Sequence, residues 1–154
     1  MAAQIMIGER IPIGADHAGY ALKEKLKATL AVLGYDVEDV GTNSPASTDY
    51  ADYAHVVAGE VEMGKARRGI LLCGTGLGMA YAANRHAHVR AAVAWNAEIA
   101  ALARLHNDAN ILVLPARFVS DEDGIAILKT WLDTPFEGGR HQRRVDKIER
   151  EEEL

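Results

Sequence analysis

Short apolar runs alternate along this chain with longer amphipathic segments, and the alternation is the feature that most constrains the fold. The run GILLC (69–73) is continuously apolar, and NILVLP (110–115) is apolar after Asn110, which is typical of strands that are buried on both faces. The segments between such runs are long enough for helices, and they carry apolar residues at helical spacing. Repetition of strand and helix predicts a parallel sheet covered by helices on both faces.

We expect strands at 10–14, 36–41, 69–73, 90–95 and 110–115. We expect helices at 17–35, 50–66, 78–86, 96–106 and 121–133, and a final polar helix through 139–154. In the first helix Leu22, Leu26 and Leu30 share an apolar face, while Lys23 is expected elsewhere. The strand at 36–41 alternates with charged residues and should lie near a sheet edge. No repeat or linker divides the chain. The predicted fold class is α/β, a single doubly wound domain (1–154) with a mostly parallel five-stranded sheet, helices on both faces and a C-terminal helix.

The charge and composition of the chain argue against nucleic acids and membranes as partners. The net charge of −5 argues against a nucleic-acid binder that depends on phosphate contacts. No apolar run approaches the length that spans a bilayer, and the first residues lack a secretory cleavage pattern. A single cysteine cannot form an internal disulfide, which suits a reducing compartment. We therefore expect a cytoplasmic protein with no nucleic-acid or membrane partner.

The stretch GILLCGTGLGM (69–79) places the only cysteine, Cys73, between a buried strand and a glycine-rich turn. Gly74, Gly76 and Gly78 let the backbone approach a ligand and point N–H groups at negative charge, and Thr75 adds a hydroxyl. A thiol next to such a turn forms thiolate more readily. Alternatively, the cysteine is a small buried hydrophobe. The turn matches the dinucleotide-binding fingerprint only weakly.

Three further side chains are expected at the same edge of the sheet. Asp16 and His17 follow the first predicted strand, and Arg117 follows the last. The carboxyl ends of parallel strands are where ligands of such sheets bind. Asp16 could instead act only as a helix N-cap.

Two other groups of polar residues are candidates. His106 and Asn107 lie between a helix and the last strand, where they could equally form a helix C-cap. Arg140 and Arg144 are four residues apart and share a helix face, so they suit a phosphate dianion or, alternatively, form a solvated basic surface. His86 and His88 lack a matching set of ligands, and no metal site or cofactor is expected.

Taken together, several segments resemble the ribose-5-phosphate isomerase B family of sugar-phosphate isomerases. The matching pieces occur in family order from about residue 11 to residue 145. They are GADHAGYALK, GT followed by TDY, GILLCGTGLGM, AANR, RLHNDANILVLPAR and FEGGRHQRRV. One branch of the family has a glutamate where this chain has Met79, so the chain resembles the cysteine branch.

The resemblance implies a Rossmann-like, metal-free aldose–ketose isomerase of carbohydrate metabolism and the pentose phosphate pathway, needing no cofactor. It would interconvert ribose 5-phosphate and ribulose 5-phosphate through a cis-enediol(ate), with Cys73 as the base. It would form a homodimer with sites at the subunit interface, and the further pairing of dimers into tetramers is left open.

The resemblance also assigns roles. His106 would assist ring opening, with His141 as a second candidate. The sugar and its phosphate would be bound by Asp16, His17, Gly74, Thr75, Gly76, Leu77, Gly78, Asn107, Arg117, Arg140 and Arg144.

Three alternatives stay open. The substrate could be another sugar phosphate, such as erythrulose 4-phosphate or an allose or galactose phosphate. The glycine turn could serve a nucleotide-binding module that needs no thiol. Cys73 could instead belong to a thiol redox protein, although no second cysteine supports that.

Overall fold

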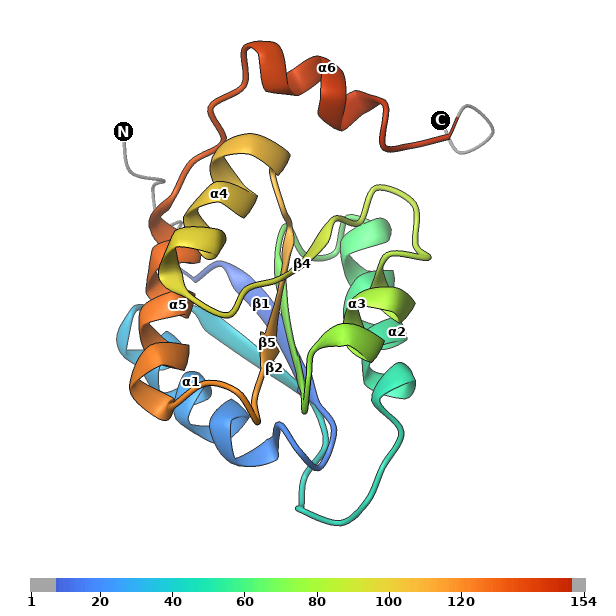
Figure 1. Ribbon diagram of the computed structural model, residues 1–154. Coiled ribbons are helices and arrows are strands. Elements are labelled where there is room, and N and C mark those ends of the chain that lie inside the picture. The colour runs from blue at the N-terminus through green and yellow to red at the C-terminus, as the bar shows by residue number, and fades with distance from the viewer. Residues whose placement is uncertain (1–7, 151–154) are drawn as a thin grey trace.

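A computed structural model of the protein describes residues 8–150, which form five strands and six helices (Figure 1). The strands are β1 (Arg10–Ala15), β2 (Asp36–Gly41), β3 (Gly69–Cys73), β4 (Ala91–Val93) and β5 (Ile111–Pro115). The helices are α1 (Tyr20–Val32), α2 (Tyr50–Glu62), α3 (Leu77–Ala83), α4 (Ala97–Asn107), α5 (Asp121–Asp133) and α6 (Arg140–Asp146). The predicted alternation of strand and helix is confirmed.

The sheet has the strand order β2-β1-β3-β5-β4, and every neighbouring pair is parallel. The sequence predicted a mostly parallel sheet, and the structure shows an entirely parallel one. The charged strand β2 lies at an edge, as expected, and the short β4 lies at the other edge.

Helices cover both faces of the sheet, with α1, α4 and α5 on one face and α2 and α3 on the other (Figure 1). Each face has its own apolar core. Successive residues of β3 alternate between them: Ile70 and Leu72 pack toward the first face, Leu71 and Cys73 toward the second. This two-residue period of a strand directs the thiol toward α2 and α3.

Of the six helices that the structure describes, only α5 has the predicted bounds, and α2, for example, ends at Glu62 and not at residue 66. α1 begins at Tyr20 rather than at residue 17, because Asp16 Oδ1 accepts hydrogen bonds from the N–H groups of Ala18 and Gly19 and holds a turn there. The final helix, expected through residue 154, ends at Asp146. Residues 151–154 of that prediction lie outside the described part of the chain.

Lys23 is also placed differently from the expectation. Its side chain is fully buried, not directed to solvent, and its Nζ lies 2.6 Å from Asp39 Oδ2 in β2. A lysine can be buried when a carboxylate pairs with its charge. None of the helices formed by residues 8–150 is long and apolar enough to cross a bilayer.

Candidate active site

The order of the strands reverses between β1 and β3, since β2 lies outside β1 while β3, β5 and β4 extend in the other direction. In open parallel sheets, ligands bind beyond the carboxyl ends of the strands at such a point. Asp16 follows β1, Cys73 ends β3, and the Asp16 N–H donates to the carbonyl of Leu72 over 3.2 Å. The two side chains are therefore held at the same opening of the sheet.

A hollow of about 340 Å³ lies at this edge. Its lining residues come from the ends of three strands and from α2 and α3: Asp16, Tyr50, Cys73, Gly74, Thr75, Gly78, Tyr81 and Arg117. Six of these eight were predicted from the sequence. Tyr50 and Tyr81 were missed, although Tyr81 lies three residues after Gly78 and so faces the same side of α3.

The thiol of Cys73 is buried, with 5% of the residue exposed, and it packs in the core that includes Met79 and Val113. It also lines the hollow. Burial and access to a ligand are therefore combined in this residue. Met79 is fully buried and does not line the hollow.

The turn between β3 and α3 needs glycine at two positions. Gly76 has a φ of +79°, which is the left-handed region that side chains disfavour. At Gly78 a Cβ atom would lie 2.2 Å from Cε1 of Tyr50, so only glycine lets the turn approach that ring. Leu77 N–H donates to Thr75 Oγ1 over 3.2 Å, which holds the turn in shape.

Asp16 and His17 both have structural partners. Asp16 is not the helix N-cap that the sequence offered as an alternative, because the N-cap of α1 is Gly19 and has no side-chain cap. The Asp16 carboxylate holds the turn before α1 and also lines the hollow. His17 Nδ1 accepts from the N–H of Thr48 over 3.2 Å and anchors the loop between β2 and α2. A neutral imidazole whose Nδ1 accepts carries its proton on Nε2.

Arg117 follows β5, and its backbone N–H donates to the carbonyl of Gly74 over 3.0 Å. Its guanidinium lies over the glycine turn, because a Cβ on Gly74 would be 3.1 Å from Arg117 Nη1. The side chain is exposed and lines the hollow. One positive charge therefore stands beside the backbone N–H groups of the turn.

The remaining predicted site residues lie at the opposite edge. α4 runs back along the sheet, so His106 and Asn107 at its end lie near the start of β5, and α6 lies beyond the same edge (Figure 1). The helix C-cap is Asp108, with a φ of 48°, and not Asn107. Asn107 is exposed, and its carbonyl accepts from Arg90 Nε over 3.1 Å.

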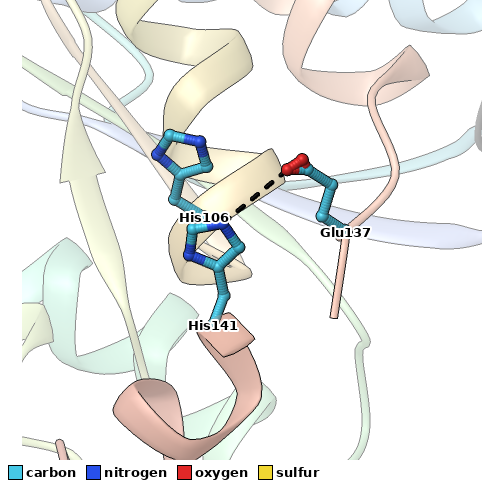
Figure 2. Close-up of side chains that lie close together, drawn as sticks. All are labelled: His106, Glu137 and His141. Carbon is cyan, nitrogen blue, oxygen red and sulfur yellow. Dashed lines mark ion pairs between the residues drawn. The ribbon is translucent and has the colours of Figure 1, made fainter. Parts of the chain in front are cut away.

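At this second edge the imidazoles of His106 and His141 are stacked, with ring centroids 4.4 Å apart and planes inclined by 15°. Glu137, which the sequence analysis did not single out, lies 3.7 Å from His141 Nε2 through its Oε1 (Figure 2). Burial, together with the nearby His106 and Arg140, lowers the pKa of His141.

Arg140 and Arg144 lie in α6, one helical turn apart, and both are exposed. Arg144 Nη1 donates to the carbonyl of Arg140 over 3.0 Å, so the two residues share a face as predicted. Arg140 is the residue before His141 in the chain, and Arg144 lies three residues after it. Imidazoles and guanidiniums therefore gather at this edge.

Within one chain, then, the predicted residues form two groups and not one site. Asp16, Cys73, the glycine turn and Arg117 stand at the carboxyl edge of the sheet, with His17 beside them. His106, Asn107, Arg140, His141 and Arg144 stand at the amino edge. The sequence alone could not show that the two groups are far apart within one chain. Polar residues follow the ends of strands and the ends of helices alike, and the pattern does not say which groups meet.

Comparison with known proteins gives one consistent result. A family model described as ribose/galactose isomerase matches residues 11–148. The ribose-5-phosphate isomerase B of Escherichia coli is 44% identical over 140 residues, which is 91% of this chain and 94% of that protein.

Solved structures agree with this family match. The ribose 5-phosphate isomerase of Thermotoga maritima superposes with a TM-score of 0.88 at 52% identity, covering 91% of this chain and 97% of the other. The ribose-5-phosphate isomerase B of Mycoplasma genitalium, solved with bound ribulose 5-phosphate, gives a TM-score of 0.89 at 43% identity and covers 93% and 95%.

Proposed function

The chain belongs to the ribose/galactose isomerase family and is an aldose–ketose isomerase, and we propose that it interconverts ribose 5-phosphate and ribulose 5-phosphate. The observation that carries this proposal is the hollow in which a thiol, a carboxylate, a glycine turn and an arginine meet. The relatives named above support the five-carbon substrate, and one of them is known with ribulose 5-phosphate bound.

The chemistry needs a base and a stabilised oxyanion. We propose that the Cys73 thiolate removes the proton from C2 of the open-chain aldose, leaving a cis-enediolate. The proton of the C2 hydroxyl passes to the oxygen of C1, and the thiol returns a proton to C1, which gives the ketose. N–H groups of the turn at Gly74–Gly78 would donate to the oxyanion, and such preorganised donors are commonly the largest single contribution to catalysis. In this mechanism the proton moves without a metal ion.

A second copy of the chain completes the site in this proposal. His106, Arg140 and Arg144 are at the wrong edge to reach the thiol of their own chain. Large apolar side chains stand exposed near the carboxyl edge, including Trp95 (55%) and Phe118 (73%), which follow β4 and β5. In this proposal these side chains are covered by the second copy. A symmetric dimer would bring each amino edge to the partner's hollow.

The amino-edge residues then take the remaining roles. Either stacked imidazole, His106 or His141, would be placed to open the sugar ring, and Asn107 would contact the sugar. Arg140 and Arg144 would hold the phosphate through charge-assisted hydrogen bonds, and phosphate held at a distance from the reacting carbons orients them. With one cysteine and no internal disulfide, we infer a reducing, cytoplasmic setting.

Hybrid dimers test the shared site directly. Cys73→Ala chains and chains that carry both His106→Ala and His141→Ala, co-expressed with different tags, yield a hybrid in which one site has all of these defects and the other has none. We expect each homodimer to be inactive and the hybrid to recover about half of the parent's activity per dimer. A hybrid as inactive as the two homodimers would show that the residues of one chain form the site. The mass of the parent in solution distinguishes a dimer from a tetramer.

A panel of sugar phosphates tests the substrate. We expect ribose 5-phosphate to give a higher kcat/KM than erythrulose 4-phosphate or allose and galactose phosphates. A higher value for one of these other sugars would overturn the substrate assignment while leaving the isomerase chemistry intact.

A further inference from the structure

His106, Glu137 and His141 come from three separate segments and meet at one point of the amino edge. His106 lies at the end of α4, Glu137 lies in the connection between α5 and α6, and His141 lies in the first turn of α6 (Figure 2). One ligand atom from each of these side chains lies within 4.8 Å of the others. The segment that carries Glu137 is tied to α4 by the Glu137 N–H, which donates to the carbonyl of Leu105 over 3.1 Å.

These donor groups suit a transition metal. Two imidazoles and one carboxylate form the protein ligand set of several zinc enzymes, in which water takes the open position. Two ligands that each lie about 2.0–2.1 Å from a tetrahedral ion are roughly 3.3 Å apart. His141 Nε2 and Glu137 Oε1 are 3.7 Å apart, which is close to that spacing. The three ligand atoms lie within 4.8 Å of one another, and the ring of His106, which is stacked on that of His141, has to turn so that both lone pairs point to the same ion.

A second histidine cluster in the structure is not suited to binding a metal ion. His55 Nδ1 and His86 Nε2 are 2.8 Å apart, which is a hydrogen bond and is too short for two ligands of one ion. The other nitrogen of His86 contacts Glu62 Oε1 at 2.9 Å. These three side chains therefore form a hydrogen-bonded chain, and their nitrogens point at each other rather than at a common centre.

We propose that His106, Glu137 and His141 bind a divalent transition-metal ion of the Zn²⁺ class, with water completing its coordination. Imidazole ligands favour zinc and its neighbours over magnesium and calcium, which prefer oxygen. The guanidiniums of Arg140 and Arg144 lie in the same segment and repel a dication, so the site is weaker than a dedicated structural zinc site. The Glu137 carboxylate supplies the compensating negative charge.

Occupancy of this site would inhibit the isomerase. A metal ion bound to His106 and His141 takes the lone pairs with which either imidazole would exchange a proton during ring opening. This consequence rests on the proposed function, whereas binding of the ion does not. The site is thus a regulatory or inhibitory one, and catalysis itself needs no metal.

Calorimetric titration of ZnCl₂ into untagged protein, stripped with EDTA and then freed of chelator, measures the binding. We expect one saturable site per chain in the parent and in His55→Gln. Glu137→Gln should weaken binding at least about tenfold, because even partners that only touch a metal ligand contribute that much. Glu122→Gln is the matched control, since this glutamate is also exposed but lies in the first turn of α5. MgCl₂ should give no heat of binding.

Three results would overturn the site. The first is that the parent takes up no zinc, and the second is that Glu137→Gln binds zinc as tightly as the parent. The third is binding that survives Glu137→Gln and vanishes in Cys73→Ala, which would place the ion at the thiol. The Glu137 side chain is exposed, and thermal unfolding checks that its variant is folded.

Isomerase assays at increasing Zn²⁺ separate the two proposals. We expect inhibition of the parent, reversed by EDTA, with a midpoint at least about tenfold higher in Glu137→Gln. Tight zinc binding at these residues without inhibition would keep the metal site and contradict the assignment of ring opening to His106 or His141. Absence of isomerase activity before zinc is added would instead contradict the proposed function.

Discussion

The buried lysine of α1 provides a quantitative test of the fold that holds the site. Lys23 is completely buried, and its Nζ is 2.6 Å from Asp39 Oδ2 in β2 and 3.2 Å from Glu24 Oε2. Asp39 also takes a 2.7 Å contact from Lys27, whose side chain is 30% exposed. This network fastens α1, which follows Asp16 and His17, to the strand that leads into the loop held by His17.

Asp39→Asn keeps the size of the side chain and removes its charge. Breaking a buried ion pair costs about 3–5 kcal/mol, because the remaining charge is left without compensation. Glu24 stays close to Lys23, so the lower end applies, and the free energy of unfolding should fall by about 3 kcal/mol. For a chain of this size that lowers Tm by about 6–12 °C.

Thermal and urea unfolding at matched protein concentration measure the loss. Asp121→Asn is the control, since Asp121 lies 3.6 Å from Lys25 and both side chains are more than half exposed. It should cost less than about 1 kcal/mol. Lys23→Met combined with Asp39→Asn removes both charges and should recover most of the stability. If Asp39→Asn proved no more destabilising than Asp121→Asn, the reasoning from burial would be refuted.

Three further predictions concern pH, packing and phosphate. Burial alone would raise the pKa of Asp39, but hydrogen bonds from two lysines outweigh it and the pKa is lowered. The resulting stability is present above the unfolded value near 3.8 and is lost as pH falls through the lower folded value, so acid unfolding curves of Asp39→Asn and the parent should converge below it. Gly78→Ala should displace Tyr50 from the hollow and lower kcat/KM by about a hundredfold, whereas Gly59→Ala, with open space around it, should leave kcat/KM unchanged. Arg140→Ala should raise KM more than it lowers kcat, and it should weaken competition by inorganic phosphate measured in the same assay.

The fold was largely predictable because short stretches of the sequence are enough to indicate its strands. Runs such as 69–73 and 111–115 are apolar throughout, and burial on both faces of a parallel sheet requires that composition. The position of Cys73 at the end of β3 follows from the same run. The burial of Lys23 was not predictable, because the charge that makes it tolerable lies on Asp39, sixteen residues away and in another element.

The candidate site was predictable in its residues but not in its arrangement. Residue types and the family resemblance pointed to Cys73 and His106 alike, yet strand order and helix direction put them at opposite edges of the sheet. Glu137 escaped notice because it gains meaning only from its distance to His141. Tyr50 escaped notice because its role depends on the close approach of Gly78.

The central claim is that the Cys73 thiol carries the proton between the two carbons of the substrate. Parent and Cys73→Ala, each with EDTA, are incubated with ribose 5-phosphate in D₂O, and NMR follows both ketose formation and deuterium at the exchanged carbon. Phosphate binding and thermal unfolding confirm that the variant is folded. If the thiol carries the proton, isomerisation and deuterium incorporation both fall at least about a hundredfold in Cys73→Ala. Equal rates of both in the two proteins would contradict it.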